Sequence, residues 1–341
     1  MGVSSLFCCI FGVVGSRQPS RFARLLALGL SGFLLGASIS LAQTANPPSD
    51  APAQAEAKPS TQDAAESAKA NSPPTKDDVF TKVIAKQKQT ETALDTYERI
   101  QRVEIRKTGS DTEPSEIKVW RLFPAGTGLD KIPLGQDEKP VNDESYRAEL
   151  EKLEKMLVWS TQSGSGQREA YAKVERKRKE RTDLIEATHN AFLFTKVGEE
   201  MRGDRKLVKY SMTPNPSYKP TTRNGVVFTR VEGTVWVDER TSELARIEGH
   251  VTEDISLALF LAKVYKGSYF MQERYELFPG MWLPTYEQYD FDGRRFLLSF
   301  SIHERTFYGH YRRVGPPKEA LEIVRGELSK TDAEHDDHGN H

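Results

Sequence analysis

Short segments of alternating polarity, joined by residues typical of tight turns, constrain the fold of this chain most strongly. Such segments dominate the second half of the sequence, at 192–200, 205–213, 230–238, 243–251, 268–278, 282–291 and 294–307. Turn residues follow three of them, at 238–242, at Pro279-Gly280 and at Asp292-Gly293, and the last dipeptide is typical of a type I′ hairpin. Because successive hairpins make neighbouring strands antiparallel, the pattern predicts a meander rather than parallel βαβ units.

A helix and an earlier hairpin precede this run. Residues 77–94 carry apolar side chains at helical spacing on a polar segment, which predicts a helix with one apolar stripe. Residues 97–107 alternate in polarity, and turn residues at 109–114 lead to a second alternating segment at 117–123. These two segments are therefore expected to pair as a hairpin.

Residues 144–187 interrupt the alternation with a charged helical insertion. Leu150, Leu153 and Leu157 have helical spacing, and a lysine- and arginine-rich helix follows a Gly/Ser-rich break. A basic run of this kind can contact anionic lipid or nucleic acid. Acidic residues interleave the basic ones, so we favour a helix with a solvated face.

The last strand indicates how the sheet and the helices combine. One of its faces is wholly apolar and holds Phe296, Leu298, Phe300 and Ile302. Such a face requires a cover, and the helical regions can supply it, which predicts an α+β domain. The helices can also leave part of the face open as a groove. The nearly uncharged run 255–265 is expected to be buried core, with a flap at the mouth of a curved sheet as the alternative.

The N-terminal region has the features of an export signal. Arginines at its start precede an apolar stretch at 25–36, and Ser40-Leu-Ala42 supplies the small residues of a cleavage site. We expect residues 1–42 to form the signal region, with cleavage before Gln43. The protein would then be periplasmic, or tethered to the membrane if the signal stays uncleaved, with envelope-membrane contact possible in either case.

Composition divides the rest of the chain. Residues 43–76 form a Pro/Ala/Ser-rich stretch that is expected to be a disordered linker. The folded domain is expected at 77–317 and a polar tail at 318–341. A net charge of -1 argues against a nucleic-acid partner. The two cysteines are both in the signal region, so a cleaved chain would hold no disulfide or thiolate site.

The sequence contains no motif that would indicate an enzyme. No catalytic, nucleotide-binding or metalloprotease motif occurs with its required spacing, so we expect no catalytic residues and no cofactor. His335, His338 and His341, near two aspartates, are a weak candidate for loose metal binding. An unstructured polar tail without a metal is the interpretation we favour.

One hairpin resembles a known superfamily. Gly233-Thr-Val-Trp-Val-Asp238 followed by Leu244-Ala-Arg-Ile247 is similar to the hairpin of the LolA/LolB-like, outer-membrane lipoprotein-sorting superfamily. The longer string from 210 to 220, with this hairpin, resembles uncharacterised exported proteins of acidobacterial type over most of 77–312. The superfamily resemblance implies a strongly curved antiparallel sheet, an unclosed half-barrel, with helices covering its concave side. The insertion at 144–187 and the chain length depart from the carriers.

The resemblance also implies a function, that of a periplasmic carrier without enzymatic activity. Its partner would be a lipid acyl chain or a lipidated protein, held in an apolar hollow by burial. The lining residues that we expect are Trp120, Trp236, Leu257, Phe260, Phe270, Trp282, Phe296 and Leu298. The alternative is a structural or sensory envelope protein of the same fold whose own helices fill the hollow. A cavity of several hundred Å³ would favour the carrier, and a filled hollow would favour the structural role.

Overall fold

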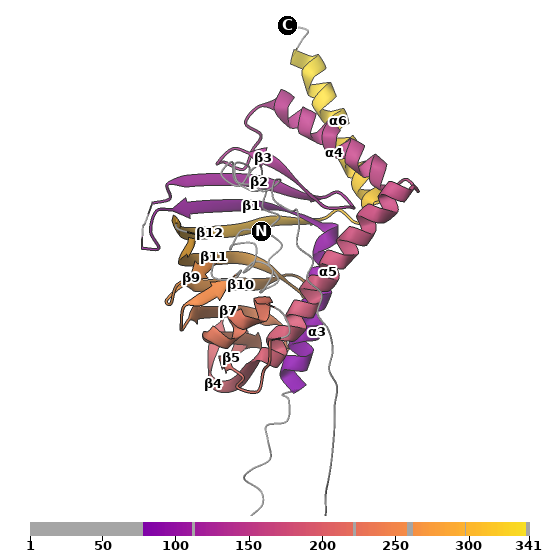
Figure 1. Cartoon of the computed structure of the whole chain (residues 1–341). Helices are drawn as coiled ribbons and strands as arrows, with labels where there is room; N and C mark the ends of the chain where they lie inside the picture. The colour runs from indigo at the N-terminus through magenta and orange to yellow at the C-terminus, as the bar shows by residue number, and fades with distance from the viewer. Residues whose placement is uncertain (1–77, 111–112, 221–222, 258–261, 297, 339–341) are drawn as a thin grey trace, which may run out of the picture. The chain divides into compact units, whose positions relative to one another are not determined.

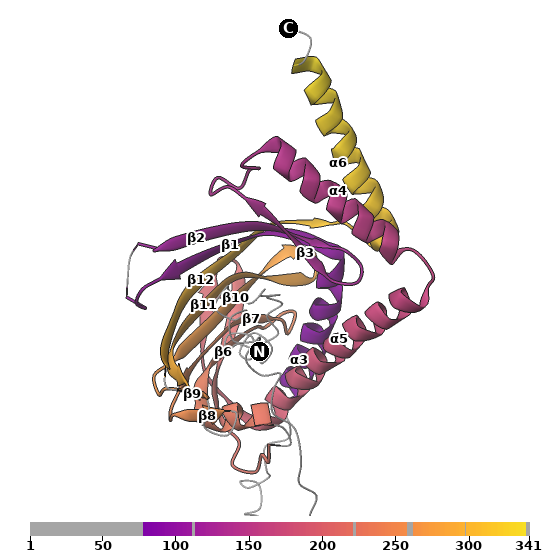
Figure 2. The same cartoon turned by 45° about the horizontal axis from the view of Figure 1, so that its top comes forward.

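A strongly curved, 12-stranded antiparallel sheet organises the protein (Figure 1, Figure 2). The structure is a computed structural model that describes residues 78–110, 113–220, 223–257, 262–296 and 298–338. The predicted signal region and linker are outside these residues. The main path of the sheet runs β3-β2-β1-β12-β11-β10-β7-β6-β5-β4, and the β8–β9 hairpin pairs with β11.

The chain builds this sheet in a nearly sequential order, with helices between its two halves. In order, the elements are α3 (Asp78–Ala93), η1 (Leu94–Thr96), β1 (Tyr97–Arg106), β2 (Glu116–Pro124), β3 (Leu129–Leu134), α4 (Asp143–Ser160), α5 (Ser165–Ala191), β4 (Phe192–Arg202), β5 (Arg205–Pro214), η2 (Arg223–Arg230), β6 (Val231–Asp238), β7 (Leu244–Val251), β8 (Ile255–Leu257), β9 (Ala262–Val264), β10 (Tyr269–Phe278), β11 (Met281–Arg295), β12 (Leu298–Arg313) and α6 (Pro317–His338).

Two helices, α3 and α5, cover the concave face of the sheet (Figure 2). The predicted apolar stripe of α3 is buried there, with Phe80 and Val83 at 3% and 4% exposure. These side chains join the main core cluster, which also contains Met212 from β5, Val235 from β6 and Ile247 from β7. The core is therefore formed between the two helices and the half of the sheet that follows them in the chain.

Helices α4 and α6 pack together on the opposite face, beside β2 and β3 (Figure 2). The leucine spacing that predicted a helix is confirmed, because Leu150, Leu153 and Leu157 are all fully buried in this second cluster. The polar tail expected from residue 318 is instead helical through His338. Leu321 and Val324 supply an apolar stripe that packs in the second cluster, which explains the difference.

Two of the three turns predicted from turn-forming residues are at the predicted positions. The β6–β7 turn follows Asp238, whose N–H donates to Glu243 O at 2.9 Å, and the β10–β11 turn contains Gly280 at a φ of 72°. The turn predicted at Asp292-Gly293 is wrong, because both residues pair in the β11–β12 ladder. A Cβ at Gly293 would lie 2.2 Å from Lys263 O, so glycine is required there by the close approach of β9.

The predicted fold class is confirmed. The sheet is antiparallel, curved and open, and helices cover its concave side, as expected for an unclosed half-barrel. Within the described part of the chain, the helices are all too short or too polar to cross a membrane.

Candidate functional site

The hollow under α3 and α5 contains a small apolar cavity. Its volume is about 70 Å³, and it lies between the two helices and strands β4 to β7. Most of its lining is apolar, with Gln87, Thr188 and His189 as the polar members. The full lining is Phe80, Val83, Ile84, Gln87, Ile185, Thr188, His189, Phe194, Met212, Val235, Leu244 and Ile247.

Aromatic packing closes one side of this cavity. The ring of Phe80 on α3 stacks on Phe194 of β4 at a centroid distance of 3.9 Å and an interplanar angle of 16°. The edge of a second ring, Tyr210 of β5, meets Phe80 at 4.9 Å. Helix α3 therefore packs on the sheet through Phe80, near its N-terminal end.

The other half of the hollow is polar. A chain of hydrogen bonds crosses four neighbouring strands on the concave face, from Arg274 through Gln272, Glu287 and Tyr308 to Gln101. Its links measure 2.8, 3.1, 3.2 and 3.1 Å. All five residues are buried. Burial raises the pKa of Glu287 to about 7, although hydrogen bonds from Gln272 and Tyr308 oppose the shift.

Helix α3 adds a buried carboxylate to this polar half. Glu91 is fully buried, and burial raises its pKa against the opposing effect of Arg274, Arg181 and Arg99. Its Oε2 atom lies 3.3 Å from Nε of Arg181 on α5. We call Glu91, Arg99, Arg274 and Glu287 the polar cluster. The hollow is thus divided into an apolar cavity and a polar cluster, both beneath α3.

Ion pairs hold α3 and α5 at the rim of the hollow. Lys86 Nζ is 3.7 Å from Glu243 Oε1, after the β6–β7 turn, and Arg178 Nε donates to Asp95 Oδ2 at 3.2 Å. Lys88 of α3 pairs with Glu186 of α5. Because most of these side chains are partly exposed, each pair contributes little to stability.

The convex face carries two of the predicted lining residues. Trp236 and Trp282 pack with Leu207 and Ala245 in a small cluster on that side of the sheet. Trp236 is 4% exposed and lies between Lys209 Nζ and the guanidinium of Arg246, at 5.0 and 4.8 Å from its ring centroid. Its Nε1 donates to Glu200 Oε2 at 2.9 Å. The tryptophans face away from the hollow.

The remaining predicted lining residues are dispersed. Phe270 is buried in the core beneath the concave face, and Trp120 is half-buried beside Lys131, whose Nζ lies 4.9 Å from its ring centroid. Phe296 and Leu298 are 51% and 73% exposed near the β11–β12 turn. The side chain of Leu257 and all of Phe260 lie outside the described residues. Among the predicted lining residues whose side chains the structure describes, Trp236 and Trp282 are the two that pack together.

Sequence reasoning missed the polar cluster. Arg99 and Glu91 belong to polar stretches that look solvated, and Arg274 lies in a strand with charged residues on both sides. No periodic signal marks them as buried. Their inward position follows from the register of β1, β10 and β11 and from the placement of α3.

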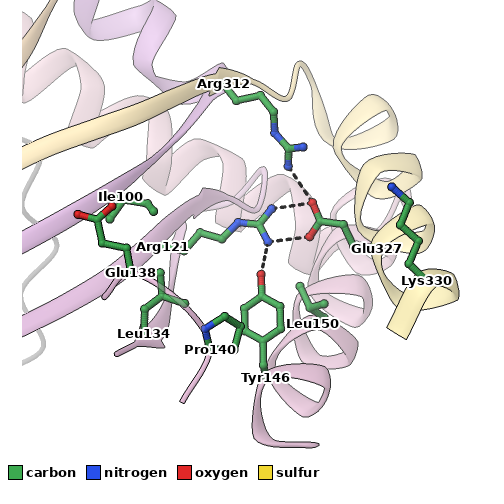
Figure 3. Close-up of a pocket in the computed structure, with 10 residues that line it drawn as sticks. All are labelled: Ile100, Arg121, Leu134, Glu138, Pro140, Tyr146, Leu150, Arg312, Glu327 and Lys330. Carbon is green, nitrogen blue, oxygen red and sulfur yellow. Dashed lines mark hydrogen bonds and ion pairs between the residues drawn. The ribbon is translucent and has the colours of Figure 1, made fainter. Parts of the chain in front are cut away.

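A second pocket of about 320 Å³ opens between β1, β3, α4 and α6 (Figure 3). Arg121 lies at its base and donates to both carboxylate oxygens of Glu327, at 2.7 and 3.0 Å, and to Tyr146 Oη at 2.7 Å. Arg312 Nη2 also donates to Glu327, at 2.8 Å. Burial alone would raise the pKa of Glu327, but its bonds to Arg121 and Arg312 hold that pKa below the usual value. The charged groups at this base therefore satisfy one another.

A histidine cluster on β11 and β12 has the residue types of a hydrolase but not the arrangement. His303 Nδ1 lies 3.1 Å from Asp290 Oδ1, and its Nε2 lies 3.8 Å from Asp292 Oδ1. Ser301 Oγ donates to that same Asp292 oxygen at 2.6 Å. In a nucleophilic triad the hydroxyl would bond to the imidazole, so Ser301 is not activated by this contact.

Metal binding by the tail stays a prediction. His335 and His338 fall in α6, but their side chains, like all of His341, lie outside what the structure describes. Among the described residues, no three His, Cys, Asp or Glu side chains are grouped as a metal site.

No family model and no curated protein matches this chain, whereas solved structures do. A domain from Vibrio parahaemolyticus named for outer membrane lipoprotein sorting matches with 10% identity and a TM-score of 0.31, over 73% of this chain and 99% of that one. A LolA superfamily protein from Nitrosomonas europaea matches with 10% identity and a TM-score of 0.24, over 73% and 98%. A DUF1329 family protein from Desulfovibrio piger matches with 11% identity and a TM-score of 0.26, over 69% and 92%.

Proposed function

We propose that this chain is an exported, non-enzymatic carrier that binds one acyl chain, of a lipid or of a lipidated partner, in the apolar half of its hollow. The observation that carries the proposal is the apolar cavity between α3, α5 and the sheet. Such a lining binds acyl groups by burial, without charge or catalytic chemistry.

The cavity must widen for this function. Its volume of about 70 Å³ is well below the roughly 300–1,000 Å³ of ligand pockets. Helices α3 and α5 form one wall, and the ion pairs at their rim are weak because they are partly exposed. An acyl chain would replace helix–sheet apolar contacts with its own, so α3 and α5 are the elements that would move.

A fatty-acid uptake assay with a cavity-filling variant tests this function. Val83, on α3, lines the cavity and is 4% exposed, so Val83→Phe should block it. Overpacking costs about 1–3 kcal/mol of stability. The matched control is Val324→Phe, since Val324 is fully buried in the α4–α6 cluster. We expect uptake of a fluorescent fatty acid by the wild type and the control, and about tenfold weaker uptake by Val83→Phe.

A second candidate function is a structural or sensory envelope protein with a filled hollow. Two observations favour it: the cavity of about 70 Å³ is far below the several hundred Å³ expected of a carrier, and buried charged residues occupy the half of the hollow beside that cavity. This candidate predicts that the wild-type protein takes up no fatty acid. Equal uptake by the wild type and Val83→Phe would instead move the acyl site away from α3.

A further inference from the structure

The pocket between β1, β3, α4 and α6 is large enough for a small ligand (Figure 3). Its volume of about 320 Å³ is at the lower end of the roughly 300–1,000 Å³ of ligand pockets. Half of its lining residues have an apolar or aromatic side chain: Ile100, Leu134, Pro140, Tyr146 and Leu150. The pocket therefore suits a ligand with a compact apolar body.

The charged groups at the base of this pocket are balanced by one another. Arg121 and Arg312 both donate to Glu327, and both also donate to Glu98. The bond from Arg121 Nε to Glu98 Oε2 measures 2.8 Å. Two guanidinium groups thus face two carboxylates, so the base does not require a charged ligand.

Two hydrogen-bond donors of the lining have no acceptor among the described residues. Tyr146 Oη accepts from Nη1 of Arg121 at 2.7 Å, so the proton of its own hydroxyl group points away from that nitrogen. Lys330 is exposed and makes no hydrogen bond or ion pair within the described part of the chain. By contrast, Glu138 at the rim has a partner, because its Oε2 lies 3.0 Å from Nε2 of His310.

The two donors lie on the same side of the pocket. Nη1 of Arg121 donates both to Tyr146 Oη and to Glu327 Oε2, each at 2.7 Å, so these two residues meet at one nitrogen atom. Lys330 follows Glu327 by three residues on α6, which places both on one face of the helix. Figure 3 shows Lys330 beside Glu327 on the α6 side of the pocket. The ligand group that fits a hydroxyl donor and an ammonium group together is an anionic acceptor.

We propose that this pocket binds a small apolar carboxylate. Its hydrocarbon body packs against Ile100, Leu134 and Leu150, and its carboxylate oxygens accept hydrogen bonds from Tyr146 and Lys330. A carboxylate fits because its two oxygens can accept from two donors at once. The proposal does not depend on the carrier function, since none of the residues that line this pocket lines the apolar cavity.

The test compares 3-phenylpropanoate with 3-phenylpropanamide on the full-length protein by ligand-observed NMR titration. The amide has nearly the size and shape of the carboxylate but no charge. Hydrogen bonds to a charged group are stronger than those between neutral groups, so the carboxylate should bind about tenfold more tightly. Equal affinities of the two probes would overturn the proposal.

Matched variants test the two donors. Tyr146→Phe removes one hydroxyl group from the pocket, and Tyr171→Phe removes one that donates to Ser160 O at 3.0 Å outside it. Tyr146→Phe should weaken carboxylate binding about tenfold, and Tyr171→Phe should leave it unchanged. Thermal melting checks that both variants are folded.

The lysine has its own control on the same helix. Lys330→Gln removes the ammonium group from the pocket, and Lys318→Gln makes the same change at an exposed position outside the lining. Because Lys330 is exposed, its loss should weaken carboxylate binding about threefold and leave amide binding unchanged. Lys318→Gln should behave as the wild type. If Tyr146→Phe does not fold, the lysine pair alone decides the outcome.

Val83→Phe separates this site from the hollow. Val83 lines the apolar cavity and not this pocket, so the variant should bind the carboxylate as tightly as the wild type. Loss of binding in Val83→Phe would place the ligand in the hollow and overturn the proposal. No binding by the wild type, or unchanged binding in both Tyr146→Phe and Lys330→Gln, would overturn it as well. A failure of fatty-acid uptake would refute the carrier function alone.

Discussion

Replacing Phe80 by alanine tests whether α3 is seated on the sheet. Phe80 is 3% exposed, stacks on Phe194 and meets the edge of Tyr210. Truncating a buried phenylalanine costs about 3–5 kcal/mol. Aromatic pairs add about 0.5–1.5 kcal/mol beyond burial, so the loss should be in the upper part of that range, about 4–5 kcal/mol.

Urea unfolding measures this loss, with an unchanged m value as the sign that only stability has changed. Phe307→Ala is the control, because Phe307 is 39% exposed and also contacts an aromatic ring, that of Tyr286. Its loss should be below about 1.5 kcal/mol, since little apolar area is buried there. A loss below about 2 kcal/mol for Phe80→Ala would show that α3 does not pack on the sheet as described.

The Phe80→Ala variant also tests whether the hollow binds a ligand. Phe80 lines the apolar cavity, so its truncation widens the space available to a ligand. A ligand that binds only the folded state raises its stability by mass action. A saturating fatty acid should therefore raise the melting temperature of Phe80→Ala by more than that of the wild type.

Two further predictions follow from the contacts and a third from the signal sequence. Trp236→Ala should cost about 3–5 kcal/mol without weakening fatty-acid uptake, because Trp236 packs on the convex face; unchanged stability with weaker uptake would contradict this. Glu287 has a folded pKa of about 7, above its unfolded value near 4.5, so its contribution is present below pH 4.5 and is lost as pH rises through 7. The contribution of Glu287 should fall by about 3 kcal/mol between these values, so the loss of stability over this range should be smaller by about that amount in Glu287→Gln than in the wild type, as urea titrations at several pH values would show. Terminal-peptide sequencing should find a mature chain that begins at Gln43, and an intact signal in membrane fractions would indicate a tethered protein.

The hairpins could be predicted because local chemistry determines them. Alternation sets the strands, and residues such as Gly280, at a positive φ, determine the turns. The failure at Asp292-Gly293 has a tertiary cause. Gly293 makes room for β9, and Asp292 accepts a hydrogen bond from Ser301 across the ladder, so neither residue forms the turn.

The site was less predictable than the fold because burial of its charged residues depends on distant segments. Glu91 is buried only when α3 packs on the sheet. Arg274 is buried only because its strand, β10, lies between β11 and β7. The tryptophans Trp236 and Trp282 were expected in the hollow, but they pack on the convex face. Alternation fixes the side of Trp236 relative to Val235, but only the curvature of the sheet decides which side is concave.

Native mass spectrometry of the protein purified from its own envelope tests whether the apolar half of the hollow holds a lipid. We expect one bound lipid per chain in the wild type and in Val324→Phe, and loss of that lipid in Val83→Phe. Lipid extraction of the wild-type complex would then identify the acyl chain and its headgroup. A wild-type protein that carries no lipid, or a Val83→Phe variant that carries as much as the wild type, would contradict the claim that the apolar half of the hollow is a carrier site.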